Sequence, residues 1–97
     1  MATKKTTRKS AERWVLVTTK HRGVFFGLLT KYADQTATLK HIRCAMYWAG
    51  KGGFLSLASQ GPVEGSRIGA EAPRCLLEDV TSVTDCSAAA VHVWREW

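Results

Sequence analysis

A chain of 97 residues is long enough for one small domain, and its 45% hydrophobic residues are enough to give that domain a core. No stretch approaches the ~20 consecutive apolar residues of a membrane-spanning helix, and three cysteines without a C-x-x-C pair argue against a disulfide framework. The formal charge of +6 is uneven: residues 1–10 carry four bases and no acid, residues 13–51 carry seven bases and one acid, and residues 61–97 carry three bases and six acids.

The N-terminal half of the chain has the pattern of a β-meander that follows a flexible basic tail at residues 1–12. Runs rich in β-branched residues, separated by short turns, predict its elements. In chain order these are a strand at 14–20, a turn at 20–23, a strand at 23–32, a tight turn at 33–35 and a strand at 36–48. Gly27 predicts a bulge or sharp bend in the second strand, and the third strand is long enough to bend, or to break in two, near Arg43 and Cys44.

The C-terminal half mixes helix and strand. Residues 54–60 fit either element, and we favour a two-turn helix because the Gly61-Pro62 that follows is a helix stop signal. The remaining predicted elements are a loop at 61–73, a strand at 74–86 with a turn or bulge near Asp79, and a terminal helix at 87–97. Ser87 is suited to cap that helix. One stripe of the helix carries Ala90, Val91, Trp94 and Trp97.

These elements predict a mainly β, α+β domain that spans residues 13–97. Four or five strongly bent strands in so short a chain usually close into a small barrel. The glycine-containing second strand and the long third strand resemble those of an Sm-like or SH3-like barrel. We therefore expect a bent-strand meander or a barrel of that kind, with one or two short helices that include a C-terminal one.

Five segments carry a more specific resemblance. They are WVLVTTKHRGVFFG (14–27), CAMYW (44–48), GGFLSLASQGP (52–62), SRIG (66–69) and DVTSV (79–83). In this order they resemble a group of short, uncharacterised bacteriophage and prophage proteins, over nearly the whole of residues 14–97. The resemblance implies a phage or prophage source and a cytoplasmic site of action in a bacterial host. It implies no activity, cofactor or catalytic residue, and the basic tail lies outside it.

Eight residues are candidates for binding an anion or a nucleotide. They are His21, Arg22, Arg43, Tyr47, Trp48, Lys51, Ser66 and Arg67. An arginine offers a planar fork to phosphate, exposed aromatic rings stack on bases, and the glycines that bracket Ser66 and Arg67 let backbone N–H groups turn toward an anion. The alternative is that these residues bind no ligand. The turn that holds His21 and Arg22 is then simply solvated, and the 61–73 loop is a packed connector in which Arg67 pairs with Glu64, Glu71 or Asp79.

Aromatic pairs on the predicted strands support an exposed binding surface. Neighbouring residues of a strand face opposite sides of the sheet. The two rings of Phe25-Phe26 must therefore lie on opposite faces, and so must the two rings of Tyr47-Trp48. A thin domain does not bury both faces, so we expect some of these rings to face a ligand or a partner. The alternative is packing against another subunit or in a second small core under the helices.

No residue pattern indicates catalysis. The glycine turn around Lys51 lacks both the spacing of a phosphate-binding P-loop and the hydroxyl that follows its lysine. His41, Cys44 and Cys86 are not spaced as metal ligands, and no Ser-His-Asp set or carboxylate pair is present. We therefore expect neither an enzyme nor a cofactor nor a metal site.

The basic half favours a polyanionic ligand, and the charge asymmetry equally favours contacts between subunits. We expect a non-enzymatic, self-associating binding module in the cytoplasm, with no membrane partner, that takes a phosphate-bearing ligand. Nucleic acid and a small nucleotide both fit, and a bacterial immune nucleotide signal is one form of the latter. The alternative is an interaction protein that binds and inhibits a host defence protein through its basic half.

Overall fold

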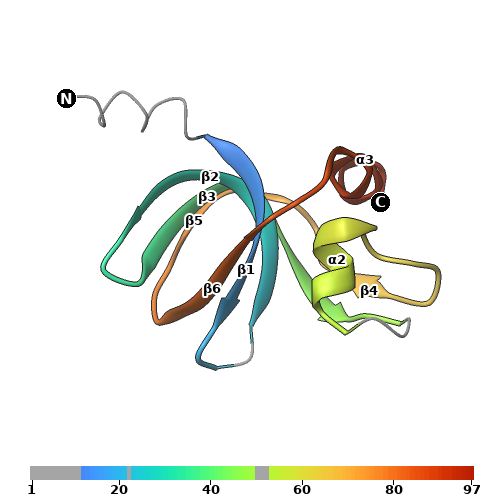
Figure 1. Cartoon of the computed structure of the whole chain (residues 1–97), viewed down its shortest axis with the longest axis horizontal. Coiled ribbons are helices and arrows are strands. Elements are labelled where there is room, and N and C mark those ends of the chain that lie inside the picture. Colours follow the sequence, from blue (N-terminus) through green and yellow to red (C-terminus); the bar gives the residue numbers. More distant parts are fainter. Residues whose placement is uncertain (1–11, 22, 50–52) are drawn as a thin grey trace.

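The computed structural model describes residues 12–21, 23–49 and 53–97. Its elements, in chain order, are β1 (Arg13–Thr19), β2 (Val24–Ala33), β3 (Thr36–Tyr47), α2 (Leu55–Ser59), β4 (Arg67–Ile68), β5 (Ala72–Leu77), β6 (Val80–Asp85) and α3 (Ala88–Glu96) (Figure 1). The predicted mainly β fold with short helices, one of them C-terminal, is confirmed. None of the helices in these ranges has the length and hydropathy needed to cross a bilayer.

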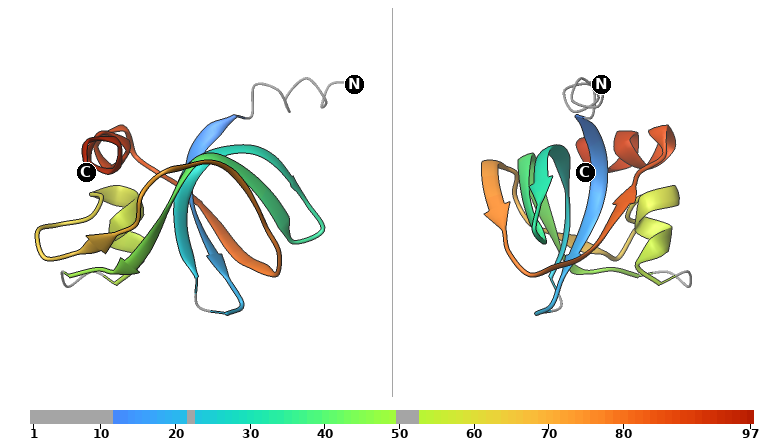
Figure 2. Two further views of the ribbon diagram at one scale, coloured as in Figure 1. Left: turned by 180° about the vertical axis from the view of Figure 1, so that it is seen from behind. Right: turned by 60° about the vertical axis from the view of Figure 1, so that its left-hand side comes forward.

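The six described strands form one antiparallel sheet in the order β4-β3-β2-β1-β6, and β5 also pairs with β3. At twelve residues, β3 is long enough to pair with β5 along its first half and with β4 near its end. The sheet is strongly curled, and both helices lie against one side of it (Figure 2). Within the described residues, no ladder of hydrogen bonds joins β5 to β6 and closes the sheet. Closure into an Sm-like or SH3-like barrel therefore stays a prediction.

The bulge expected at Gly27 in the second strand lies instead on the partner strand, where His41 and Ile42 of β3 together oppose Gly27. The register between β2 and β3 shifts between Phe26 and Leu28, on either side of this glycine. A Cβ atom at Gly27 would lie 3.0 Å from the Cβ of Leu39 and 3.0 Å from the carbonyl oxygen of Lys40. Close approach of the β3 backbone therefore requires a glycine here.

The predicted tight turn is a two-residue hairpin between β2 and β3. Asp34 and Gln35 have φ angles of 51° and 62°, the left-handed pair that a type I′ turn requires. The long strand that follows does not break in two: β3 is continuous, and its irregularity lies at His41, where φ is 52°, rather than at Arg43 and Cys44. A left-handed residue inside a strand turns the following side chains, so the strand bends without ending.

Apolar side chains of the described residues form two clusters, one on each side of the sheet. The first, which we call the sheet core, consists of Val15, Val17, Leu29, Ala37, Leu39, Ile42, Leu77 and Val80. The second, which we call the helix core, consists of Leu16, Val24, Phe26, Ala45, Leu57, Ala58, Ala90 and Trp94. The alternation of Val15, Leu16 and Val17 along β1 supplies both clusters, because successive side chains of a strand face opposite sides.

The helix core corrects the expectation that a thin domain leaves one face of the sheet open. Phe26 is buried between Trp14 and Trp94, with ring centroids 5.1 and 4.8 Å away, and Phe25 packs against the sheet core. Neither ring of that pair faces outward. Of the second aromatic pair, Trp48 packs against the helix core and Tyr47 is 56% exposed. A second small core under the helices, the alternative interpretation, is what the structure contains.

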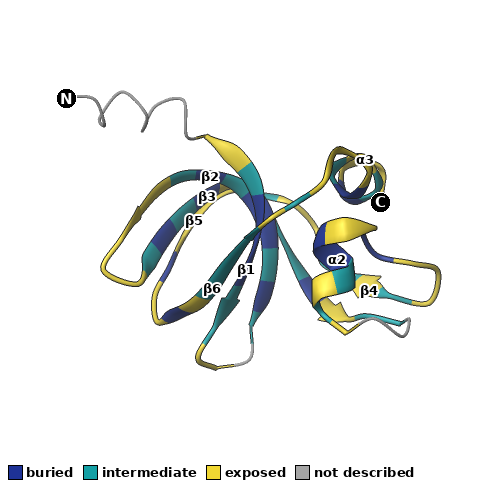
Figure 3. Cartoon of the chain, in the orientation of Figure 1, coloured by how far each residue is buried: buried dark blue, intermediate teal, exposed yellow. Residues whose placement is uncertain are grey.

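The C-terminal half departs from the expected elements in three places. The helix α2 has five residues rather than two turns, with one side buried and the other exposed (Figure 3). The expected loop at 61–73 contains β4 and the start of β5. The expected strand at 74–86 is two strands, β5 and β6, separated by a turn in which Asp79 has a φ of 57°.

The terminal helix begins as predicted. The Ser87 hydroxyl accepts a hydrogen bond from the backbone N–H of Ala90 at 3.0 Å, which satisfies one of the free donors of the first turn. Ala90 and Trp94 of the predicted stripe are buried in the helix core, and the Trp94 indole donates to the carbonyl oxygen of Leu57 at 2.9 Å. Trp97, the last member of the stripe, lies beyond the helix and is 42% exposed.

Candidate phosphate-binding site

The short strand β4 places an aromatic ring beside a guanidinium. In its ladder with β3, Ala45 pairs with Ile68 and Tyr47 pairs with Arg67, with an irregularity at Met46 between them. Ala45 and Ile68 pack in or against the helix core, whereas Tyr47 and Arg67 are exposed. Directly opposite residues of a ladder have side chains on the same side, about 5 Å apart at Cβ, so the phenol of Tyr47 and the guanidinium of Arg67 share one small surface.

Three polar contacts hold the segment around β4 in place. The hydroxyl of Ser66 accepts a hydrogen bond from the backbone N–H of Ala49 at 3.1 Å. The N–H of Gly69 donates to the carbonyl oxygen of Cys44 at 2.8 Å, and Arg43 Nε donates to the carbonyl oxygen of Gly69 at 2.9 Å. The segment is thus a fixed connector on β3, and the exposed Arg67 projects from an anchored backbone.

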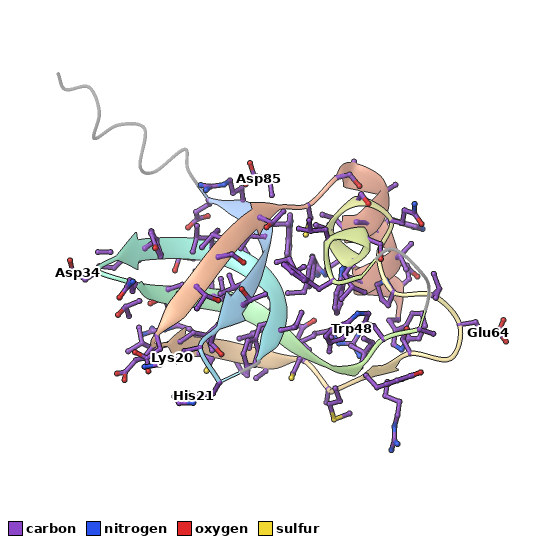
Figure 4. The ribbon with its side chains drawn as sticks, turned by 60° about the horizontal axis from the view of Figure 1, so that its bottom comes forward. Lys20, His21, Asp34, Trp48, Glu64 and Asp85 are labelled. Atoms are coloured by element: carbon purple, nitrogen blue, oxygen red, sulfur yellow. The ribbon has the colours of Figure 1, made fainter. Side chains whose placement is uncertain are left out.

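None of the acids expected to neutralise Arg67 does so. Glu71 binds His41 Nδ1 at 2.9 Å, and Asp79 lies 3.7 Å from His21 Nε2. Glu64 lies at the outer end of the loop that precedes β4 (Figure 4). Within the described ranges, Arg67 makes neither a side-chain hydrogen bond nor an ion pair. Its guanidinium therefore keeps its five donors available for an anion.

The other candidates are spread over the molecule. His21 is in the β1–β2 turn, apart from Trp48 and Glu64 (Figure 4), and its side chain is 80% exposed. Arg22 and Lys51 lie outside the described residues. Arg43 is half-buried and committed to the carbonyl oxygens of Gly69 and Trp94, so it positions the backbone rather than facing a ligand. The structure thus brings Tyr47, Ser66 and Arg67 together and leaves His21 elsewhere.

The cysteines considered as metal ligands are separate thiols. Burial raises the pKa of the Cys44 thiol. The pKa of the Cys86 thiol is raised to about 12, mainly by burial and to a smaller extent by the nearby Asp85 carboxylate. Both therefore stay protonated at neutral pH, in the form that binds metals poorly. Among the described residues, no three His, Cys, Asp or Glu side chains come together as a metal-binding group.

Two cationic residues that the sequence did not single out also lie side by side. Lys40 on β3 pairs directly with Arg74 on β5, and both are exposed. They are 34 positions apart, so only the register of the two strands brings them together. The two histidine–carboxylate pairs were missed for the same reason.

The comparisons identify a family but supply no activity. No curated protein and no solved structure matches the chain. A family model matches residues 12–94, from the residue before β1 to Trp94 in α3. The match covers most of the chain, including the segment around β4 and both cores. The chain therefore belongs to the family described as Domain of unknown function (DUF6948).

Proposed function

We propose that this protein is a non-enzymatic binding module for a phosphate-bearing ligand, with the Tyr47–Arg67 pair as its contact. One observation carries the proposal. Tyr47 and Arg67 are directly opposite each other on β3 and β4, both are exposed, and no described acid neutralises the guanidinium. A guanidinium binds phosphate oxygens through two parallel hydrogen bonds, and an exposed ring beside it stacks on a base.

Anchoring of the segment supports this assignment. The contacts of Ser66, Gly69 and Arg43 fix the backbone on both sides of Arg67 before any ligand arrives. A ligand then orders only the two side chains, and not a loop, so less conformational entropy opposes binding. The formal charge of +6 adds long-range attraction for a polyanion.

The ligand chemistry proposed is a nucleotide unit, either free or within a nucleic-acid strand. The resemblance to phage and prophage proteins would place this binding in a bacterial cytoplasm, where a nucleotide immune signal is one such ligand. Self-association and closure of the sheet into a small barrel are part of the same proposal. Native mass spectrometry of the purified chain measures the number of subunits and any nucleotide that stays bound.

Fluorescence anisotropy with a labelled 12-nucleotide DNA strand and with a labelled mononucleotide tests the proposal. We expect Arg67→Gln to weaken binding and to reduce the slope of log K against log salt by about 1, because one phosphate contact is lost. We expect Tyr47→Ala to weaken binding by about 5- to 100-fold, the effect of removing one stacking ring. Lys20→Gln, with the same charge change in the β1–β2 turn, is the control and should bind as the unmodified protein does.

Equal binding by Arg67→Gln and Lys20→Gln would contradict the assignment of the site. Absence of binding to both probes at 50 mM salt would contradict the function itself. A preference for the mononucleotide over the strand assigns the Tyr47–Arg67 pair to a small nucleotide, and the reverse assigns it to nucleic acid. Circular dichroism of each variant checks that the fold is intact.

A protein partner is the second candidate function, because an exposed apolar side chain lies beside the Tyr47–Arg67 pair. Met46 directly precedes Tyr47 on β3 and is 62% exposed. Apolar residues beside a basic one are typical of the centre of a protein interface. Substitution of Met46 with Ser would weaken protein capture and leave nucleotide binding unchanged.

A further inference from the structure

Two cations face each other across β3 and β5. Lys40 and Arg74 are directly paired in the ladder, both side chains are exposed, and neither has a hydrogen bond or ion pair to another described residue. Like charges directly opposite each other on a sheet destabilise it. A pair of this kind is relieved by an anion that lies between the two side chains.

The pair belongs to a row that crosses four strands. Trp14 on β1 pairs with Leu28 on β2, Leu28 pairs with Lys40, and Lys40 pairs with Arg74. Trp14 packs against the helix core, so the whole row lies on the side of the sheet that carries the helices. At the β1 end of the row, the Arg95 guanidinium lies 4.6 Å above the Trp14 ring. The row therefore has cations at both ends, about 14 Å apart at the usual strand spacing.

The nearby acids are bound to other partners or lie beyond the row. Glu71, which precedes β5, binds His41 at 2.9 Å, and the His41 ring lies 6.1 Å from the Trp14 ring of the row. Glu78 follows the last residue of β5, four positions beyond Arg74. Asp85, at the end of β6, binds Arg13. The positive charge of the Lys40–Arg74 pair is thus left without a carboxylate from the described chain.

We propose that Lys40 and Arg74 form a second phosphate-binding site, separate from the Tyr47–Arg67 pair. Arg74 supplies the fork to two phosphate oxygens and Lys40 supplies a point charge from the neighbouring strand. Arg95, at the other end of the row, gives a longer polyanion a further contact. The site therefore favours a phosphodiester strand over a free phosphate ion, and it goes beyond the proposed function because it rests on different residues.

Thermal unfolding of the full chain in sodium phosphate, compared with sodium chloride of equal ionic strength, tests the site. We expect phosphate to raise the unfolding temperature of the unmodified protein, and Lys40→Gln and Arg74→Gln each to remove that rise. Lys20→Gln is the matched control and should keep it. Without phosphate, Lys40→Gln should unfold at a higher temperature than the unmodified protein, because the repulsion from Arg74 is gone.

Anisotropy with a labelled 12-nucleotide DNA strand separates the two sources of phosphate. A weaker affinity in both variants, with a salt slope reduced by about 1, supports the site and assigns it to a phosphodiester strand. If the two variants lose the stabilisation by phosphate but bind the DNA strand as the unmodified protein does, the pair is a site for the free phosphate ion. The proposal is overturned if Lys40→Gln, Arg74→Gln and Lys20→Gln behave alike in both measurements. Arg67→Gln leaves this site intact, so either site can fail by itself.

Discussion

Arg43 on β3 donates a hydrogen bond from Nη1 to the carbonyl oxygen of Trp94 at 3.1 Å, across 51 positions of sequence. The same guanidinium donates from Nε to Gly69, just beyond β4, at 2.9 Å. One half-buried cation therefore joins the end of α3, the β4 segment and the middle of the sheet. It also adds a second donor to the Trp94 carbonyl oxygen in the last turn of α3, which the N–H of Trp97 reaches at 3.4 Å.

Arg43→Met is expected to destabilise the protein by about 1–3 kcal/mol, because the side chain keeps its length but loses its hydrogen bonds to the carbonyl oxygens of Gly69 and Trp94. Urea denaturation measures the free energy of unfolding. Arg67→Met is the matched control: Arg67 is exposed and makes no side-chain hydrogen bond in the described chain, so its change should stay within about 0.5 kcal/mol. Equal losses in the two variants would contradict the role given to Arg43.

Trp94→Phe removes the indole N–H that donates to the Leu57 carbonyl oxygen at 2.9 Å. Trp94 is fully buried, so the variant leaves that oxygen without a partner and also leaves a small cavity in the helix core. We expect a loss of about 2–4 kcal/mol in urea denaturation. Trp97→Phe makes the same change at an exposed position and should cost far less. A difference below about 0.5 kcal/mol between the variants would rule out this role for Trp94.

Gln35→Gly is expected to stabilise the protein. Gln35 has a φ of 62°, a conformation that glycine adopts without the strain of a Cβ atom. The hydrogen bond from the Val80 N–H to the Gln35 carbonyl oxygen belongs to the backbone and survives the change. The free energy of unfolding should rise by about 0.5–1 kcal/mol. Gln35→Ala keeps the Cβ atom, and a rise of the same size in that variant would contradict the explanation.

Stability is expected to fall at alkaline pH through Cys86. Burial, followed by the Asp85 carboxylate, raises the pKa of its thiol to about 12 in the folded state, from 9.0. Above pH 9 the unfolded chain releases this proton and the folded chain keeps it, so rising pH favours unfolding until the folded thiol also ionises. The stability that the protonated Cys86 thiol contributes to the folded state is therefore complete below pH 9 and is lost as the pH rises toward 12.

Urea denaturation at several pH values measures this slope, which the partial exposure of the thiol makes smaller than the ideal single-proton value. Cys86→Ala should lose stability less steeply between pH 9 and 11. Cys75→Ala, which removes an exposed thiol, should follow the unmodified protein. Parallel slopes for all three proteins would show that Cys86 does not contribute.

Local signals in the sequence predicted local features. The irregular pairing at Gly27, the turn at Asp34 and Gln35 and the cap at Ser87 each depend on one or two residues and their neighbours. The two-residue strand β4 was missed because it is too short to show any alternation. Of the two aromatic pairs expected to expose some rings, only the second does so, through Tyr47, because α2 and α3 cover a face that periodicity alone cannot show to be covered.

The candidate sites show the same contrast between features set by neighbouring residues and features set by contacts that are distant in sequence. Residue types identified Tyr47, Ser66 and Arg67 as a group suited to phosphate, but not the strand pairing that sets Tyr47 against Arg67. The Lys40–Arg74 pair had no sequence signal, because it depends on the register of two strands separated by α2 and β4. The acid partners of His21 and His41 are likewise distant in sequence.

The alternation of Val15, Leu16 and Val17 along β1 has a consequence for how the protein unfolds. The sheet core takes two of these side chains and the helix core takes the third, so the same backbone supports both. Separation of β1 from β2 exposes both clusters together. Neither cluster stays packed by itself, because each loses side chains of β1. The two layers therefore melt in a single cooperative transition, with the slowest hydrogen exchange at the amides of β1 and β2.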